Sequence, residues 1–94
     1  MSGQFRVLVT SHCVREMRNL LSSNPELEVN LEKLKAILQQ DPLNRTRRFN
    51  IKKLKGVKPG QGQWRIRSGS YRLRYDIFSK DVVLYSFRHR KEAY

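Results

Sequence analysis

The sequence predicts an α+β fold with an N-terminal strand, a two-helix hairpin and a three-stranded antiparallel meander. Three observations support this prediction: a β-branched and aromatic run at residues 4–9, helical apolar spacing over residues 10–41, and period-two alternation in three segments after residue 62. A chain of 94 residues has room for one modest core. We therefore expect residues 1–94 to form a single domain.

The first segment, from Gln4 to Val9, favours a strand because it is rich in β-branched and aromatic residues. Thr10 and Ser11 offer a hydroxyl that can cap a helix, which we expect to end near Ser22 and Ser23. Its buried face would consist of apolar residues at helical spacing: Val14, Met17, Leu20 and Leu21. The single cysteine, Cys13, cannot form a disulfide within the chain, and we expect it to be a small buried hydrophobic residue.

A second helix is predicted directly after the first, so that the two form an αα-hairpin. Asn24, Pro25 and Glu26 fit a helix cap, a first helical position and an acidic first turn. The buried face of this helix would consist of Leu27, Leu31, Leu34, Ile37 and Leu38. We expect it to end at Asp41, because the residue before a proline is disfavoured in the helical conformation.

The segment from Leu43 to Gly60 has no clear period, and we expect a loop or a short irregular strand there. Three strands are predicted after it, at residues 63–67, 71–78 and 82–87. The short connections at residues 68–70 and 79–81 favour consecutive antiparallel hairpins. Together with the N-terminal strand they would make a four-stranded sheet.

The chain is strongly basic, with 20 Lys and Arg residues, eight Asp and Glu residues and a formal net charge of +12. Such an excess destabilises a compact monomer and favours an anionic partner, either a polyanion or an acidic protein. The charge is clustered, since eleven basic residues and no acidic residue lie between Pro42 and Tyr75. No apolar run approaches the ~20 residues of a membrane span and no signal-peptide layout is present, so we expect a cytoplasmic protein that does not contact a membrane.

Strand alternation places several of these basic residues on one face. Arg65 and Arg67 alternate with apolar residues in one predicted strand, and Arg72 and Arg74 do so in the next. Because the apolar side must meet the helices, the arginines would face solvent, where like charges on neighbouring strands repel. A phosphate backbone would relieve this repulsion. We predict contact with nucleic acid, the alternative being a solvated basic surface or a patch for an acidic protein.

The sequence lacks the usual patterns for metal or nucleophilic catalysis, and we expect neither a metal nor another cofactor. Cleavage of RNA by its own 2′-hydroxyl needs a proton acceptor, charge stabilisation and a proton donor, and arginine suits the second task. His89 and Tyr94 are the candidates for proton transfer, with a surface imidazole and a packing ring as the alternatives. We interpret His12, at a helix start, as structural.

Three segments follow the two helices in a fixed order: KKLKG at residues 52–56, WRIRSGSYRLRYDI at 64–77 and HRKEAY at 89–94. In these segments, and in the order of its elements, the chain resembles the RelE/ParE toxin superfamily. The resemblance implies a largely antiparallel four-stranded sheet packed on an N-terminal helical hairpin, and a cognate antitoxin that wraps and neutralises the toxin. We expect a monomer when the chain is free and a heteromeric complex with the antitoxin.

RelE-like members of that superfamily enter the ribosomal A site and cleave messenger RNA. The resemblance implies six catalytic residues here, namely Arg65, Arg67, Arg72, His89, Arg90 and Tyr94. Arg65 and Arg67 would hold RNA and stabilise charge, and Arg72 would grip the scissile phosphate. Tyr94 would act as the base, with Arg90 or His89 assisting the leaving group. Further contacts with RNA and the ribosome are expected from Arg45, Arg47, Arg48, Lys52, Lys53, Lys55, Lys58 and Arg74.

Function divides within the superfamily, because ParE-like members inhibit DNA gyrase and have no nuclease activity. The HRKEAY tail and the arginine face favour the RelE-like function. We therefore predict the toxin of a type II toxin–antitoxin system, an mRNA interferase that inhibits translation as a ribosome-dependent, metal-independent endoribonuclease. The alternatives are a gyrase inhibitor of the same fold and a non-catalytic RNA-binding homologue.

Overall fold

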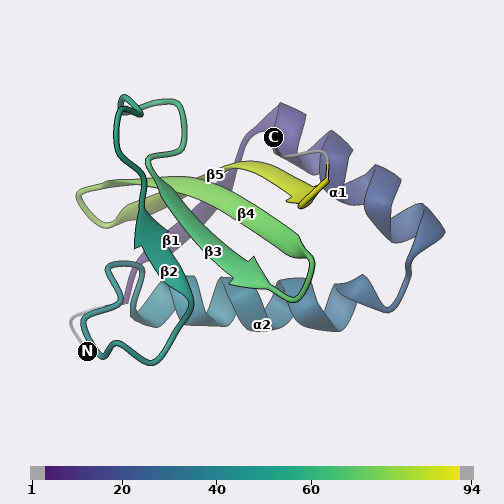
Figure 1. The fold of residues 1–94 in the computed structure, drawn as a ribbon, viewed down its shortest axis with the longest axis horizontal. Helices are drawn as coiled ribbons and strands as arrows, with labels where there is room; N and C mark the ends of the chain where they lie inside the picture. The colour runs from purple at the N-terminus through teal and green to yellow at the C-terminus, as the bar shows by residue number, and fades with distance from the viewer. Residues whose placement is uncertain (1–3, 92–94) are drawn as a thin grey trace.

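The computed structural model describes residues 4–91, which form a five-stranded sheet with two helices packed on one of its faces (Figure 1). The elements are β1 (Arg6–Val9), α1 (Ser11–Ser23), α2 (Leu27–Gln40), β2 (Ile51–Lys53), β3 (Trp64–Ser68), β4 (Tyr71–Phe78) and β5 (Asp81–His89). The strands lie in the order β1-β5-β4-β3-β2. This arrangement confirms the predicted α+β class, the pair of consecutive helices and the antiparallel meander of β3, β4 and β5.

The sheet has five strands, so the predicted count of four was wrong. The additional strand, β2, lies in the segment without a clear period and pairs antiparallel with β3, with Ile51 opposite Ile66 and Lys52 opposite Arg65. A strand of three residues is too short for alternation to be visible in the sequence. The sequence left a loop or a short irregular strand open for this segment, and the pairing with β3 shows the strand.

The N-terminal strand β1 reaches the other end of the sheet and pairs in parallel with β5. Val7 lies opposite Val82, and Val9 lies opposite Leu84, which is the last pair of this ladder. A parallel neighbour requires a long connection, and here it runs through both helices and strands β2, β3 and β4. Beyond Leu84, β5 continues without β1 beside it.

Strand β5 contains a bulge that changes which of its side chains face the helices. Arg74 lies opposite Ser86 and Tyr75 lies opposite Leu84, so Tyr85 is an extra residue between two paired positions. Before the bulge, Leu84 is buried; after it, Phe87 is buried. The alternation is therefore reversed between the two halves of β5.

Helix α1 begins as predicted, with the Thr10 hydroxyl accepting a hydrogen bond from the Cys13 N–H at 3.1 Å. The predicted start of α2 was two residues too early, because the helix begins at Leu27 after a turn. Asn24 does not cap α2 with its side chain. Instead, its backbone and side-chain N–H groups both donate to Leu20 O, at 2.8 and 3.2 Å, and so close the end of α1.

The core lies between the helices and the sheet. Its buried apolar residues are Cys13, Met17, Leu27, Leu31, Leu34, Leu38, Ile66, Leu73, Tyr75, Val82, Leu84 and Phe87. Cys13 is buried in this core, which confirms its predicted role as a packing residue, and the burial raises the pKa of its thiol to about 12. Among residues 4–91, no helix has the length and apolar character that a membrane crossing would need.

Candidate nucleic-acid interface

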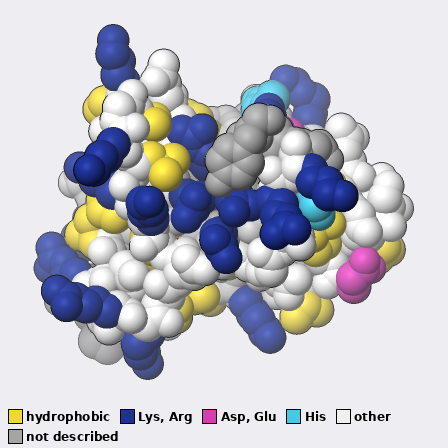
Figure 2. All heavy atoms as spheres, in the orientation of Figure 1, with side chains coloured by type: hydrophobic (Ala, Val, Ile, Leu, Met, Phe, Trp, Pro, Cys, Tyr) yellow, Lys and Arg dark blue, Asp and Glu magenta, His cyan; other side chains and the backbone are white. Residues whose placement is uncertain are grey.

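The face of the sheet that the helices leave open carries basic side chains in two rows across neighbouring strands. The first row contains Lys52, Arg65 and Arg74, and the second contains Arg67, Arg72 and Arg88. Directly opposite residues of an antiparallel pair have Cβ atoms about 4.5–5.5 Å apart, so each row brings three cations into close proximity. Figure 2 shows Lys and Arg side chains gathered across the middle of this face. We call these two sets the basic rows.

Five of the predicted site residues lie in the basic rows: Lys52 in β2 and, where the predicted alternation places them, Arg65, Arg67, Arg72 and Arg74. Arg67 is exposed, whereas Arg65, Arg72 and Arg74 are partly buried. No acidic side chain among residues 4–91 forms an ion pair with Arg67. Repulsion between neighbouring guanidinium groups opposes this arrangement unless an anion lies over it. The open face therefore concentrates positive charge that can attract an anion.

Arg88 was missed by the sequence analysis, although it lies directly opposite Arg72. Simple alternation from the buried residues Val82 and Leu84 would place Arg88 on the helix side of the sheet. The bulge at Tyr85 moves it to the open face. The buried Phe87 next to it was the signal that could have indicated this position.

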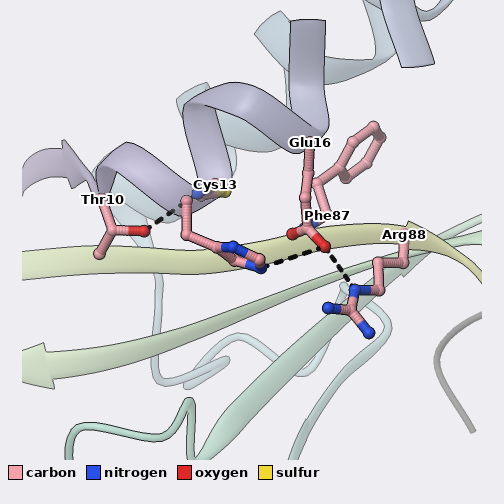
Figure 3. Close-up of polar contacts among 6 residues, drawn as sticks. Thr10, Cys13, Glu16, Phe87 and Arg88 are labelled. Carbon is pink, nitrogen blue, oxygen red and sulfur yellow. Dashed lines mark hydrogen bonds and ion pairs between the residues drawn. The ribbon is translucent and has the colours of Figure 1, made fainter. Parts of the chain in front are cut away.

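One carboxylate of helix α1, that of Glu16, holds Arg88 in place (Figure 3). Glu16 forms an ion pair with the Arg88 guanidinium and accepts a hydrogen bond from the Phe87 N–H at 3.1 Å. His12 Nε2 lies 3.3 Å from the same carboxylate. Because β1 pairs with β5 only as far as Leu84, Glu16 supplies an acceptor that a neighbouring strand would otherwise provide.

Arg74 and Asp76 hold the loop between β2 and β3 against the open face. Arg74 donates to Gly62 O from Nε at 3.1 Å and from Nη2 at 2.9 Å. The buried Asp76 carboxylate accepts from the N–H groups of Gly60, Gly62 and Gln63 at 2.7, 3.0 and 2.7 Å. A Cβ at position 62 would lie 3.0 Å from Arg74 Cβ, and φ there is +79°, so this contact requires glycine. Arg74 thus has a structural role as well as a charge.

The predicted residues near the C-terminus are not all brought beside the basic rows. His89 lies opposite Tyr71 and contacts its ring edge-on with centroids 5.2 Å apart, on the side of the buried Phe87. Arg90 is exposed, and its N–H donates to Ser70 O at 2.7 Å. Tyr94 lies outside the described residues. The structure therefore places His89 on the opposite face of the sheet from Arg72.

A comparison with known proteins agrees with this architecture. No family model and no curated protein matches the chain. Among solved structures, a chain of the RelB–RelE antitoxin–toxin complex from Methanococcus jannaschii matches with a TM-score of 0.70, covering 93% of this chain and 94% of that chain at 20% identity. The chain has a RelE-like fold. The fold implied by the resemblance of the sequence is thereby confirmed, with one strand more than expected.

The other predicted contact residues of this RelE-like fold lie in β2 and in the segments on either side of it. Arg45, Arg47 and Arg48 are exposed in the turn after α2, where Asp41 accepts hydrogen bonds from the N–H groups of Arg45 and Thr46 at 2.8 and 3.1 Å. Lys55 and Lys58 are exposed in the loop before β3. Lys53 differs from Lys52, because it lies opposite Trp64 with its Nζ 5.7 Å from the ring centroid.

The open face of this RelE-like fold can therefore bind phosphates and stabilise negative charge. Guanidinium groups are permanently charged and present forked donors that match phosphate oxygens. Within residues 4–91, no three His, Cys, Asp or Glu side chains are grouped as a metal site would require.

Proposed function

We propose that this chain is the toxin of a type II toxin–antitoxin pair and that it cleaves messenger RNA in the ribosomal A site. The observation that carries the proposal is the second basic row, in which Arg67, Arg72 and Arg88 lie opposite one another on three adjacent strands. A surface of this kind is suited to a phosphodiester that gains negative charge during reaction. The RelE-like fold supports the same assignment.

The proposed reaction uses the nucleophile that RNA itself carries. The 2′-oxygen attacks the adjacent phosphorus while its proton passes to a base, and the bond from phosphorus to the 5′-oxygen breaks. A proton delivered to that 5′-oxygen completes the step. The products are a 2′,3′-cyclic phosphate and a 5′-hydroxyl. Charge on the phosphoryl oxygens is stabilised by guanidinium groups, so the mechanism does not call for a metal ion.

Each basic residue has a distinct proposed role. Arg72, at the centre of its row, grips the scissile phosphate, while Arg67 and Arg88 flank it. Arg65 holds the neighbouring part of the RNA chain. Tyr94 remains the proposed base, with Arg90 assisting the leaving group. His89 is a weaker candidate than the sequence suggested, because its ring packs on Tyr71.

The proposed protein partner is an acidic and partly apolar antitoxin. The formal charge of +12 favours such a partner. Three large apolar side chains are also exposed among the described residues, with exposed fractions of 39% for Leu8, 61% for Val29 and 44% for Phe78. Co-expression with the antitoxin should raise the yield of soluble toxin and abolish growth arrest. No gain from co-expression would count against this part of the proposal.

The proposed activity is tested by mapping the cut ends of a translated message in a purified translation system, with and without ribosomes. Wild-type protein should cut within the reading frame only when ribosomes are present, and the Arg72→Ala variant should not cut. A DNA supercoiling assay with gyrase serves as the parallel measurement. Inhibition of gyrase without any cut ends would overturn the nuclease proposal in favour of gyrase inhibition.

A further inference from the structure

A polar hollow of about 190 Å³ opens on the same face as the basic rows, between β5 and the loop before β3. It is lined by Gln61, Arg74, Tyr85, Ser86 and Arg88. Arg74 belongs to the first basic row and Arg88 to the second. The hollow therefore adjoins both rows, yet neither the resemblance nor the proposed reaction gives it a role.

The bulge in β5 creates one wall of this hollow. Leu84 faces the core, and the extra residue Tyr85 turns its side chain to the open face beside Ser86. A bulge commonly redirects a side chain in this way next to a binding site. Without the extra residue, an aromatic ring would not lie among the basic residues of this face.

The opposite wall is the loop that carries Gln61, and it is held firmly. Asp76 accepts three backbone hydrogen bonds from this loop, and Arg74 donates two to Gly62 O. Gln61 itself is exposed, and its Oε1 accepts from the Lys58 N–H at 3.3 Å. Burial and the nearby Asp76 raise the pKa of Tyr85, so its hydroxyl keeps its proton at neutral pH. The walls thus present an aromatic ring, a hydroxyl and an amide, and the backbone of the loop that carries the amide is held in place.

These groups match the chemistry of a nucleobase better than that of a phosphate alone. A base has a flat face that stacks on an aromatic ring and an edge that accepts and donates hydrogen bonds. The hollow is smaller than the roughly 300–1,000 Å³ of a typical small-molecule pocket, as expected for one ring system in place of a whole ligand. We propose that it receives one base of the RNA strand whose phosphates lie on the basic rows. This inference rests on the proposed function.

The test is a comparison of binding to single-stranded RNAs that each lack one base. The probes are short 2′-O-methyl RNAs, which cannot undergo the cleavage step, with an abasic nucleotide at each position in turn. Removal of the base that enters the hollow should weaken wild-type binding about tenfold, the scale of one stacked base. The Tyr85→Ala variant should bind the intact RNA about tenfold more weakly and should be insensitive to that abasic position.

Three further variants make the outcome decisive. Tyr85→Phe keeps the ring and should retain the abasic effect, and Gln61→Ala, at an exposed loop position, should change the preference among the four bases. Gln39→Ala removes the same kind of side chain as Gln61→Ala from an exposed position of α2 and should change nothing. If Tyr85→Ala is poorly folded, the Gln61→Ala and Tyr85→Phe results decide.

Failure of this inference can be distinguished from failure of the proposed function. If the abasic scan of Tyr85→Ala equals that of the wild type, while Arg67→Ala still weakens binding, the hollow does not hold a base. If wild-type protein binds none of the RNAs and Arg67→Ala has no effect, the nucleic-acid interface itself is wrong.

Discussion

Glu16 of helix α1 forms an ion pair with Arg88 of strand β5, and its carboxylate also accepts a hydrogen bond from the Phe87 N–H at 3.1 Å. The contact lies beyond Leu84, where β1 no longer pairs with β5. The Glu16 carboxylate thus accepts a hydrogen bond at a strand edge that has no neighbouring strand. It also fixes the Arg88 guanidinium opposite Arg72. The Glu16 carboxylate therefore links the packing of α1 on β5 to the position of Arg88 in the second basic row.

Removing the Glu16 carboxylate should destabilise the fold. We expect Glu16→Ala to lower the free energy of unfolding by about 1–3 kcal/mol, because it leaves the Phe87 N–H without an acceptor. Glu16→Gln should cost less, since an amide oxygen can still accept that hydrogen bond. Urea denaturation measures both. The control is Glu32→Ala, whose carboxylate lies 3.7 Å from Lys35 on the surface and should contribute less than about 1 kcal/mol. Equal losses of unfolding free energy in Glu16→Ala and Glu32→Ala would contradict this role of Glu16.

Asp76 should be important for both stability and the shape of the loop before β3. Its carboxylate accepts hydrogen bonds from Gly60, Gly62 and Gln63 and is only 1% exposed. We expect Asp76→Ala to lower the free energy of unfolding by about 2–3 kcal/mol and to speed hydrogen exchange at those amides. Thermal denaturation and exchange measured by NMR give the two readings. Unchanged exchange in the loop would show that Asp76 does not hold it.

The stability of the chain should fall in acid partly because of Asp41. Burial alone would raise the pKa of Asp41, but hydrogen bonds from Thr46 and from the Arg45 and Thr46 N–H groups outweigh it and lower the pKa from its ordinary value of 3.8. A lowered folded-state pKa stabilises the fold above the ordinary value, and this stabilisation is lost as the pH falls through the folded value. The Asp41→Asn variant should therefore lose less stability than wild type between about pH 5 and pH 2. Glu28→Gln, at an exposed position of α2, is the control and should follow the wild-type curve.

Most of the fold could be predicted because its elements have strong local patterns. The spacing of Leu27, Leu31, Leu34 and Leu38 defined α2, and the alternation around Ile66 and Leu73 defined β3 and β4. Strand β2 was expected only as one of two alternatives, a loop or a short irregular strand, since a three-residue strand depends on the neighbour with which it pairs. The start of α2 was misplaced because Asn24 could cap the start of α2 or close the end of α1, and in the structure it closes α1.

The site could be predicted only in part, for a similar reason. The bulge is on β5, and alternation on β3 and β4 is regular at the predicted arginines. It therefore placed them correctly on the open face: Arg65, Arg67, Arg72 and Arg74. Arg88 follows the bulge, and in the sequence only Phe87, which is out of phase with Val82 and Leu84, indicates the extra residue. The same reversal places His89 on the side of Phe87, away from Arg72.

Arg72 should be the basic residue whose loss affects cleavage most. Loss of a single donor to a transition-state oxyanion typically lowers the rate about 10²–10³-fold, and we expect that effect for Arg72→Ala in the ribosome-dependent assay. Arg72→Lys keeps the charge but loses the forked donors, so it should recover only part of the rate. Arg18→Ala, at an exposed position of α1, is the matched control. Full activity of Arg72→Ala would exclude the proposed role of Arg72.

The most direct measurement of the central claim, that the basic rows receive an RNA strand, is the salt dependence of RNA binding. Each phosphate contact with a single strand contributes about −0.7 to the slope of log K against log salt concentration. Arg67→Ala, which removes an exposed cation of the second row, should make the slope less steep by about that amount. Arg18→Ala removes the same charge from α1 and should leave the slope unchanged. Equal slopes for the wild type and Arg67→Ala, or equal changes in both variants, would contradict the claim.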